Sequence, residues 1–364
     1  MCILAPKAGR LFPKTQPPAL EGAGADQRVF IQFFQLAFGL FGPKAFCRHT
    51  APRQLRGCFT RAVGLLQLRQ QDGKGPQMAT GTHIRTYFNG QWHEGDIAVI
   101  RAADHGAWLG SGVFDGARYV NGLAPDLLAH CSRVNRSAQA LMLTPTITPQ
   151  DMVQIVWDGL QAYPKDAAVY IRPMYWGIDG DITAIVPSAD TTGFAICLEE
   201  IPMAPETATT TLGLTQFRRP VLESAVVNAK AGCLYPNNAR MLRDVRARGF
   251  GNALVADAMG NVAESATANV FMAKDGEVFT PIANGTFLAG ITRARHMANL
   301  RADGVNVHET VLSFDDFRSA DEVFLSGNMN KVTPVTAFED VQYQVGPITR
   351  RARQLYWDWA ASTA

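Results

Sequence analysis

The chain has 364 residues, 47% of them hydrophobic and 18% charged, so it can bury a substantial core and is long enough for two domains. The formal net charge of +2 is uneven: residues 1–77 hold 11 Lys and Arg against 3 Asp and Glu, and the remainder holds 23 against 29. This mildly acidic remainder argues against nucleic acid as a partner, because phosphate binding needs a basic face. The six cysteines are scattered without a CxxC pair or a Cys/His cluster, so we expect no disulfide framework, no metal site and a cytoplasmic protein.

Residues 1–77 differ from the rest in composition, because Pro, Gly, Gln and Arg dominate them and only one apolar run, at 29–41, interrupts them. That run is too short to span a bilayer, so we expect no membrane partner. Regular strand patterning begins at Met78. We therefore expect residues 1–77 to be an extension that is disordered or not translated, with Met78 at or near the true start; a processed targeting segment is the alternative.

Strand and helix patterns alternate in the first half of the chain after Met78. Asn89-Gly90 favours a type I′ turn and predicts a hairpin, and Asp126 precedes apolar residues at helical spacing, so we expect it to cap a helix. The elements predicted here are hairpin strands at 84–88 and 91–94, helices at 127–141 and 149–162, and strands at 168–176 and 193–201. Together they predict a small domain at 78–203.

A stretch rich in Pro, Ala and Thr at 204–212 lacks apolar periodicity and predicts a linker between two domains. Beyond it, Pro236 and Gly249 stand where a helix would start and stop, and turns at 259–261 and 275–276 predict two hairpins. The elements predicted in this half are a strand at 212–217, a helix from Tyr235 to Gly249, strands at 262–266 and 269–273, a helix at 292–304, a short helix at 314–318, a strand-loop-strand at 321–337 and a helix at 347–361. They predict an α+β domain at 213–364.

One lysine, Lys230, lies among small and apolar residues in the segment VVNAKAGCLYP, with Tyr235 five residues later. An amine in such surroundings is desolvated, which favours imine formation with an aldehyde. The alternative is a lysine that extends from a helix surface to water, and spacing alone favours this alternative. A second pattern decides between the two interpretations.

The second pattern is the segment ESATANVFMAKDGEVFTPIANGTFLAGITRAR, from Glu264 to Arg295. Glu264, Asn269-Val270-Phe271, Val278-x-Thr280 and Leu288-x-Gly290-Ile291-x-Arg293 resemble the class IV (fold-type IV) pyridoxal-phosphate aminotransferases. The interval of 34 residues from Lys230 to Glu264 also matches that family. The resemblance covers nearly all of residues 80–364. It implies a two-domain fold with a smaller N-terminal α/β domain, a larger C-terminal cofactor-binding domain and pyridoxal 5′-phosphate as cofactor.

The resemblance assigns roles to individual residues. Lys230 would bind the cofactor covalently and act as the catalytic base, and Glu264 would keep the ring nitrogen protonated, which makes the ring an electron sink. Tyr235 would hydrogen-bond the phenolic oxygen, and Leu288 would pack against the ring. Backbone N–H groups at a helix start and one arginine would bind the phosphate. The implied cofactor residues are Arg133, Lys230, Tyr235, Glu264, Asn269, Leu288, Ile291, Thr292 and Asn328.

For the substrate, the stretch HGAWLGSGVFDGARYVNG and the Tyr-x-Arg pair of Tyr170 and Arg172 resemble the branched-chain amino-acid aminotransferases. Both side chains of the pair emerge on one face of a strand, and in that group the pair helps to bind substrate carboxylates. The loop with Asn328 and Met329 would supply backbone donors to phosphate and to the α-carboxylate. The implied substrate residues are Phe114, Gly116, Arg118, Tyr170, Arg172 and Met329.

Three features depart from the branched-chain pattern: Leu109 stands in place of a pocket tyrosine, Asp115 in place of a glutamate, and the Asn-Met-Asn-Lys loop is atypical. The function implied by the resemblance is transamination of branched-chain L-amino acids (Leu, Ile, Val) with 2-oxoglutarate in a homodimer. The (R)-selective amine transaminases, which diverge in the same pocket, are the alternative. A catalytically silent scaffold protein is a third hypothesis, which loss of Lys230 or Glu264 would favour; both are present.

Overall fold

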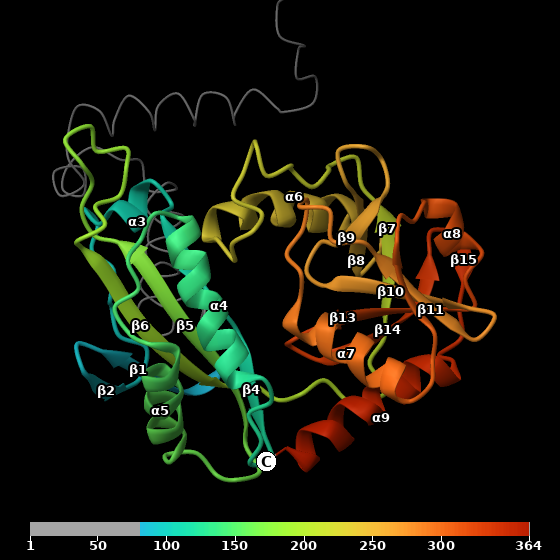
Figure 1. Ribbon diagram of the computed structural model, residues 1–364, viewed down its shortest axis with the longest axis horizontal. Helices are drawn as coiled ribbons and strands as arrows, with labels where there is room; N and C mark the ends of the chain where they lie inside the picture. Colours follow the sequence, from blue (N-terminus) through green and yellow to red (C-terminus); the bar gives the residue numbers. More distant parts are fainter. Residues whose placement is uncertain (1–80, 364) are drawn as a thin grey trace, which may run out of the picture. The chain divides into compact units, whose positions relative to one another are not determined.

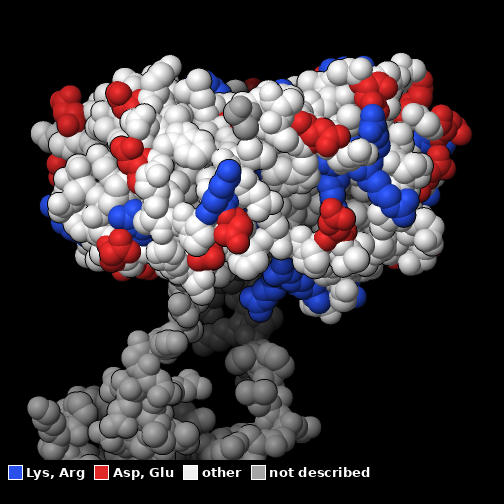
Figure 2. Space-filling model, turned by 90° about the horizontal axis from the view of Figure 1, so that it is seen from below, with Lys and Arg blue, Asp and Glu red and all other residues white. Residues whose placement is uncertain are grey.

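The computed structural model describes residues 81–363 (Figure 1). The extension predicted at 1–77, its apolar run and the start predicted at Met78 lie outside the described residues. Among the described helices, none is long and apolar enough to cross a membrane. On the face drawn in Figure 2, basic and acidic side chains are interspersed.

The first half of the described chain forms a six-stranded antiparallel sheet. Its strands follow the order β2-β1-β6-β5-β3, and β4 also pairs with β5. Asn89 and Gly90 have φ values of 51° and 83°, which confirms the tight turn predicted between the first two strands. The strands are β1 (Thr82–Phe88), β2 (Gln91–Glu94), β3 (Gly112–Phe114), β4 (Ala117–Val120), β5 (Ala168–Gly177) and β6 (Thr192–Glu200).

Two helices, α4 (Leu127–Ala140) and α5 (Pro149–Leu160), cover one face of this sheet, and the short α3 (His105–Trp108) precedes β3 (Figure 1). Thr148 caps α5 by accepting a hydrogen bond from the backbone N–H of Asp151 at 3.1 Å. Apolar side chains at helical spacing face the sheet, as predicted. The fully buried residues of this core include Cys131, Val134, Ala138, Met152, Val156, Val169, Ile171, Ile196 and Leu198.

Asp126 precedes α4, but the prediction that it caps this helix is wrong. Its φ of 57° lies in the left-handed region, and its side chain makes no cap hydrogen bond. The carboxylate instead accepts a hydrogen bond from Nη2 of Arg295 at 2.7 Å. Because Arg295 belongs to the C-terminal half of the chain, this ion pair joins the two halves of the described protein.

The second half forms a nine-stranded mixed sheet in the order β12-β11-β10-β13-β14-β7-β8-β9, with β15 beside β14. A short turn joins the edge strand β9 to β10, so the sheet curls, and the backbone N–H of Ser265 donates to the carbonyl of Ala268 across this turn at 2.9 Å. The strands are β7 (Thr210–Leu214), β8 (Asn252–Ala256), β9 (Val262–Ser265), β10 (Asn269–Lys274), β11 (Glu277–Pro281), β12 (Val307–Thr310), β13 (Glu322–Gly327), β14 (Lys331–Phe338) and β15 (Val341–Gln342).

The strand predicted at 212–217 is displaced, because β7 begins at Thr210, inside the predicted linker, and ends at Leu214. It pairs in parallel with both β14 and β8 and therefore lies inside the sheet. Threonines fit such a pleated surface because their side chains branch at Cβ. Because threonine is polar, these residues show no apolar alternation, and the start of the strand could not be predicted from the sequence. The two-domain division at 204–212 stays a prediction.

Helices cover the second sheet: α6 (Tyr235–Arg246) packs on β8, and α7 (Ile291–Ala302) packs with α9 (Pro347–Ser362). A single 3₁₀ turn, η1 (Gly232–Leu234), leads into α6, and α8 (Phe314–Arg318) starts with a capping box of Ser313 and Asp316. The helix boundaries lie within a few residues of the predicted ones.

Candidate active site

Lys230 lies in the segment before η1, and residues of the first sheet hold its backbone. Its N–H donates to Oγ of Ser137 on α4 at 3.1 Å, and its carbonyl accepts from the N–H of Phe114 at 3.1 Å. The adjacent Ala229 and Ala231 are buried in the core of the first sheet. The chain therefore returns to the N-terminal half after β7 and places this lysine where the two halves meet.

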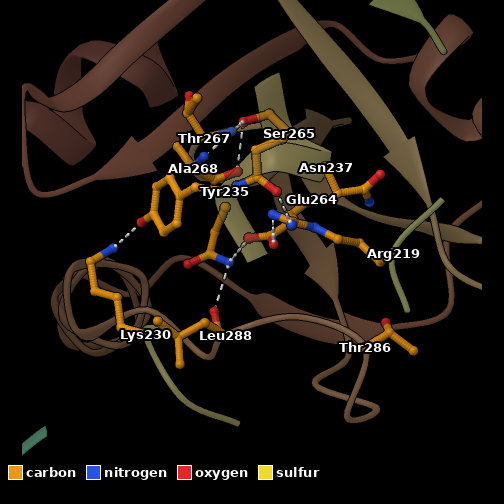
Figure 3. A network of polar contacts seen from close by, with 12 residues as sticks. Arg219, Lys230, Tyr235, Asn237, Glu264, Ser265, Thr267, Ala268, Thr286 and Leu288 are labelled. Atoms are coloured by element: carbon orange, nitrogen blue, oxygen red, sulfur yellow. Dashed lines mark hydrogen bonds and ion pairs between the residues drawn. The ribbon is translucent and has the colours of Figure 1, made fainter. Parts of the chain in front are cut away.

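The amine of Lys230 points to two aromatic rings. Its Nζ donates to Oη of Tyr235 at 3.0 Å (Figure 3), and it lies 5.0 Å from the centroid of the Phe114 ring. Tyr235 begins α6, so the fold of that helix fixes the phenol next to the lysine. The pair of Lys230 and Tyr235 singled out from their spacing is thus a direct contact.

Glu264 lies on β9 and is only 6% exposed. Its carboxylate forms an ion pair with Arg219 (Figure 3). It also accepts a hydrogen bond from Nδ2 of Asn269 at 3.1 Å. The same amide group of Asn269 donates to the carbonyl of Leu288 at 3.2 Å, which joins the acid to the loop before α7. Burial raises the pKa of Glu264, and the charges of Arg219 and Lys230 oppose this effect.

A single cavity of about 650 Å³ connects these groups, a volume typical of small-molecule sites. Every residue predicted for the cofactor lines it, and so do four of the residues predicted for the substrate. The predicted residues on its wall are Phe114, Gly116, Arg133, Tyr170, Lys230, Tyr235, Glu264, Asn269, Leu288, Ile291, Thr292, Asn328 and Met329.

The start of α7 forms one wall of the cavity. Gly290 is its N-cap and offers no side chain, so the N–H groups of Ile291 and Thr292 have no cap partner from that residue. A Cβ at position 290 would overlap the side-chain oxygen of Asn269, so only glycine allows the backbone to approach this closely. Free N–H groups at a helix start favour an anion such as a phosphate.

Arg133 reaches the cavity from α4 and is held by a buried acid. Its Nε and Nη2 donate to the two oxygens of Asp115 at 2.6 and 2.8 Å, and Nδ1 of His130 lies 2.8 Å from the same carboxylate. Asp115 is completely buried, but the charges of Arg133 and His130 outweigh the effect of burial and lower its pKa far below the ordinary value. This arrangement fixes the guanidinium in one orientation.

Two predicted substrate residues, Arg118 and Arg172, do not line the cavity. Arg118 is completely buried, and it donates to the carbonyl of Ile201 at 2.6 Å and to the sulfur atoms of Met203 and Met329. Arg172 forms an ion pair with Glu199 instead. Neither guanidinium is part of the cavity wall.

Sequence reasoning missed the partners that orient these groups. Arg219 is one of two adjacent arginines, and no spacing links it to Glu264, 45 residues later. No pattern in the sequence singles out His130 or Ser137, but both support the site. Within residues 81–363, no group of three or more His, Cys, Asp or Glu residues could hold a metal ion.

Comparisons with known proteins identify the family of the chain. The family model described as amino-transferase class IV matches residues 112–338. The chain belongs to this family. A putative branched-chain-amino-acid aminotransferase of Methanocaldococcus jannaschii is 28% identical over 282 residues, which cover 76% of this chain and 96% of the relative.

Two solved structures share the fold. An aminotransferase from Brucella abortus, bound to the cofactor PLP, is 54% identical with a TM-score of 0.76 and covers 77% of this chain and 99% of its own. A branched-chain aminotransferase from Thermoproteus uzoniensis, solved with norvaline, is 25% identical with a TM-score of 0.71 and covers 77% and 95%. The chain is therefore an aminotransferase of fold-type IV that uses pyridoxal phosphate, as the sequence predicted.

The cavity fits this cofactor on three observations of its own. It contains a lysine amine for the aldehyde, Lys230; a buried carboxylate for the ring nitrogen, Glu264; and uncapped N–H groups at the start of α7 for the phosphate. Arg133, held by Asp115, adds a positive charge to the cavity wall. The amine, the carboxylate and the N–H groups therefore match the aldehyde, the ring nitrogen and the phosphate of the cofactor.

Proposed function

We propose that this aminotransferase transfers the amino group of branched-chain L-amino acids to 2-oxoglutarate, giving branched 2-oxo acids and L-glutamate. The observation that carries the proposal is the aromatic wall of the cavity, where Phe114 lies beside Nζ of Lys230 and Tyr170 lines the same cavity. A wall of this kind favours a hydrocarbon side chain on the substrate. The M. jannaschii and T. uzoniensis relatives are named as branched-chain aminotransferases, which agrees with this choice.

Tyr170 shapes the substrate side of the cavity. Its ring lies next to Gly116, where a Cβ would overlap the phenol, so the glycine leaves room for the tyrosine. Burial raises the pKa of Tyr170 to about 12, so the phenol keeps its proton in the neutral range and is available as a donor to a substrate. A neutral donor beside an apolar wall suits an amino acid with an aliphatic side chain and one carboxylate.

The residues of the site have the following roles in this proposal. Pyridoxal phosphate, when bound, supplies an aldehyde that reacts with amines and a ring that withdraws electrons from the substrate α-carbon. Lys230 would anchor it and, when its amine is free, would take the α-carbon proton onto Nζ and deliver it to the cofactor carbon that carried the aldehyde. Tyr235 orients Nζ, and Glu264 would hold the ring nitrogen in its protonated form. The remaining cofactor residues would hold the phosphate and the ring faces; they are Arg133, Asn269, Leu288, Ile291, Thr292 and Asn328.

The test is a panel of half-reactions with the purified yellow protein, followed by the absorbance of the bound cofactor. We expect L-leucine, L-isoleucine and L-valine to convert the cofactor to its amine form faster than D-alanine or (R)-1-phenylethylamine does. Glutamate formed from 2-oxoglutarate is then measured in the second half-reaction. A faster reaction with D-alanine than with the three L-amino acids would contradict the substrate assignment.

One observation favours a second candidate, an (R)-selective amine transaminase. Arg172 is occupied by Glu199, and Met203 and Met329 cover Arg118, so neither guanidinium lines the cavity to receive a substrate carboxylate. An amine without a carboxylate needs no such partner. In the same panel, a higher rate with (R)-1-phenylethylamine than with L-leucine would support this candidate.

We also propose a homodimer, as the family resemblance implies. Large apolar side chains are exposed on two neighbouring segments, at Trp108 (59% exposed) on α3 and at Ile185 (66%) in the loop before β6. His105 joins these segments through a contact of 3.1 Å between its Nε2 and the carbonyl of Ile185. Exposed apolar groups that lie together favour an interface. Light scattering on the purified protein gives the mass; a monomer at micromolar concentration would contradict the proposal.

A further inference from the structure

A buried lysine stands behind the cavity in the turn between β13 and β14. Asn328 and Met329 in this turn line the cavity, and Lys331 begins β14 directly after it. Lys331 has a φ of 63°, in the left-handed region that favours glycine. A glycine would relieve this backbone, so the presence of a lysine points to a use for its side chain.

The side chain of Lys331 is completely buried and points back to the turn. Its Nζ donates to Oδ1 of Asn328 at 2.7 Å and lies 5.2 Å from the centroid of the Tyr356 ring. No ion pair joins Nζ to a carboxylate of the described residues, since the nearby Asp126 is paired with Arg295. A buried cation without a paired acid is costly, so its one polar contact, to Asn328, carries unusual weight.

Several titratable and charged groups face Lys331 from the elements packed around it. They are Arg118 on β4, Asp126 before α4 with its partner Arg295, His130 on α4, His296 on α7, and Tyr356 on α9. Burial and then the charge of Arg118 lower the pKa of Lys331 to about 7, while Asp126 opposes them. Burial lowers the pKa of His296 to about 4 and raises that of Tyr356, so neither group changes charge near neutral pH.

We propose that Lys331 is a positioning residue for the substrate side of this site, and that the proton on its amine sets how firmly the Asn328–Met329 segment is held. The charged amine makes a charge-assisted hydrogen bond to Asn328, which is stronger than the bond made by a neutral amine. Protonation therefore tightens the cavity wall that faces the substrate. This inference rests on the proposed function only because its first test measures the KM for a substrate of that reaction.

The decisive experiment compares wild type with K331M, which keeps the length of the side chain and removes its donor. We expect the KM for L-leucine to rise roughly tenfold at pH 6 and only about threefold at pH 8.5, because a charged hydrogen bond is worth more than a neutral one. The value of kcat should stay within about twofold, since Lys331 touches neither the cavity nor Lys230. The ratio of mutant to wild-type KM cancels the titration of all other groups.

The matched control is K274M, which makes the same chemical change on an exposed lysine that donates to Ser319 at 3.0 Å. Its KM ratio should remain near one at every pH. A K331M ratio that stays constant with pH would overturn the inference and leave Lys331 a purely structural residue. If K331M does not fold, N328A serves instead, because it removes the acceptor; retention of the wild-type pH dependence of KM in N328A would equally overturn the inference.

A second readout uses the cofactor-free protein and no substrate. Between about pH 7 and pH 10 the unfolded chain binds a proton at Lys331 that the folded chain has released, so wild-type stability rises with pH in this window. The difference in melting temperature, wild type minus K331M, should therefore increase from pH 7 to pH 9. A protein that never reacts with L-leucine would refute the proposed function, but this stability test would still show whether Lys331 releases its proton on folding. A difference in melting temperature that does not change with pH would refute the inference about Lys331 alone.

Discussion

The two ends of the cavity are built differently. At the end assigned to the cofactor, each acid has fixed partners: Glu264 contacts Arg219 and Asn269, and Asp115 contacts Arg133 and His130. At the end assigned to the substrate, two cations, Arg118 and Lys331, are completely buried without an acid in direct contact among the described residues.

The hydrogen bonding of the acids follows the same division, although Nε of Arg219 beside Glu264 is also buried without a partner in the described protein. Nε of Arg118 and Nδ2 of Asn328 are buried without a hydrogen-bond partner in the described protein, whereas both oxygens of Asp115 and of Glu264 are engaged. Groups that are already paired keep their geometry before the ligand arrives, which is what a resident cofactor needs. Groups that lack partners leave the substrate side open to adjustment. We expect substitutions to affect cofactor chemistry at the first end and substrate affinity at the second.

The largest expected effect comes from K230A at the cofactor end. Loss of the amine removes both the anchor and the proton acceptor, so transamination of L-leucine should fall by at least about 10³-fold. Borohydride reduction followed by peptide mapping should label Lys230 in the wild type and no lysine in the variant. K274A is the control, because its amine lies on the surface. Label on another lysine in the wild type would contradict the assignment.

E264Q should have the next largest effect, because it removes the charge and keeps the shape of the side chain. Arg219 then loses its partner in a buried setting, and the free energy of unfolding should fall by roughly 3 kcal/mol. The kcat should drop by at least about tenfold, since a neutral amide holds no proton on the ring nitrogen. Denaturant unfolding and steady-state kinetics measure the two effects.

The matched control for this change is E277Q, on an exposed glutamate with hydrogen bonds to Asn306 and His308. We expect neither its kcat nor its unfolding midpoint to change appreciably, because solvent screens an exposed pair. An E264Q enzyme as active as E277Q would show that the acid of β9 has no part in the chemistry.

The sequence was sufficient to predict most of the fold, because local signals determined it. Asn89-Gly90 predicted the first hairpin, and the Gly249 stop and the Pro347 start bounded helices that the structure contains. Glu264, Asn269, Leu288 and Ile291 were predicted as a group, because they lie within one short segment whose spacing is characteristic.

The remainder depended on tertiary contacts that no local spacing encodes. Arg118 follows Gly116 by two residues, so strand alternation predicts that both face the cavity. However, the guanidinium of Arg118 donates to the carbonyl of Ile201 and to the sulfur atoms of Met203 and Met329, and these contacts keep it out of the cavity wall. Arg219 was missed for the same reason, since Glu264 reaches it only in the folded chain. Lys331 contacts Asn328 three residues earlier, but its burial against Tyr356 of α9 depends on the tertiary fold.

D115N is expected to have the smallest effect of the three and tests whether the buried acid serves the phosphate side of the cofactor end. The amide cannot hold Arg133 in a fixed orientation, so the affinity of the cofactor-free protein for pyridoxal phosphate should fall about tenfold while kcat at saturation changes little. Because the folded-state pKa of Asp115 lies below its unfolded value, its stabilisation is present above about pH 4 and is lost as the pH falls further.

The stability difference between wild type and D115N should accordingly be constant from pH 5 to pH 7 and shrink below pH 4. D303N is the control, since Asp303 makes a similar pair with Arg351 on the surface and should alter neither the cofactor affinity nor the acid stability appreciably. If D115N binds the cofactor as tightly as D303N does, Asp115 stabilises the fold without orienting Arg133. Only Glu264 would then be a preorganised acid of the cofactor end. The contrast between the two ends of the cavity would depend on the contacts of Glu264 alone.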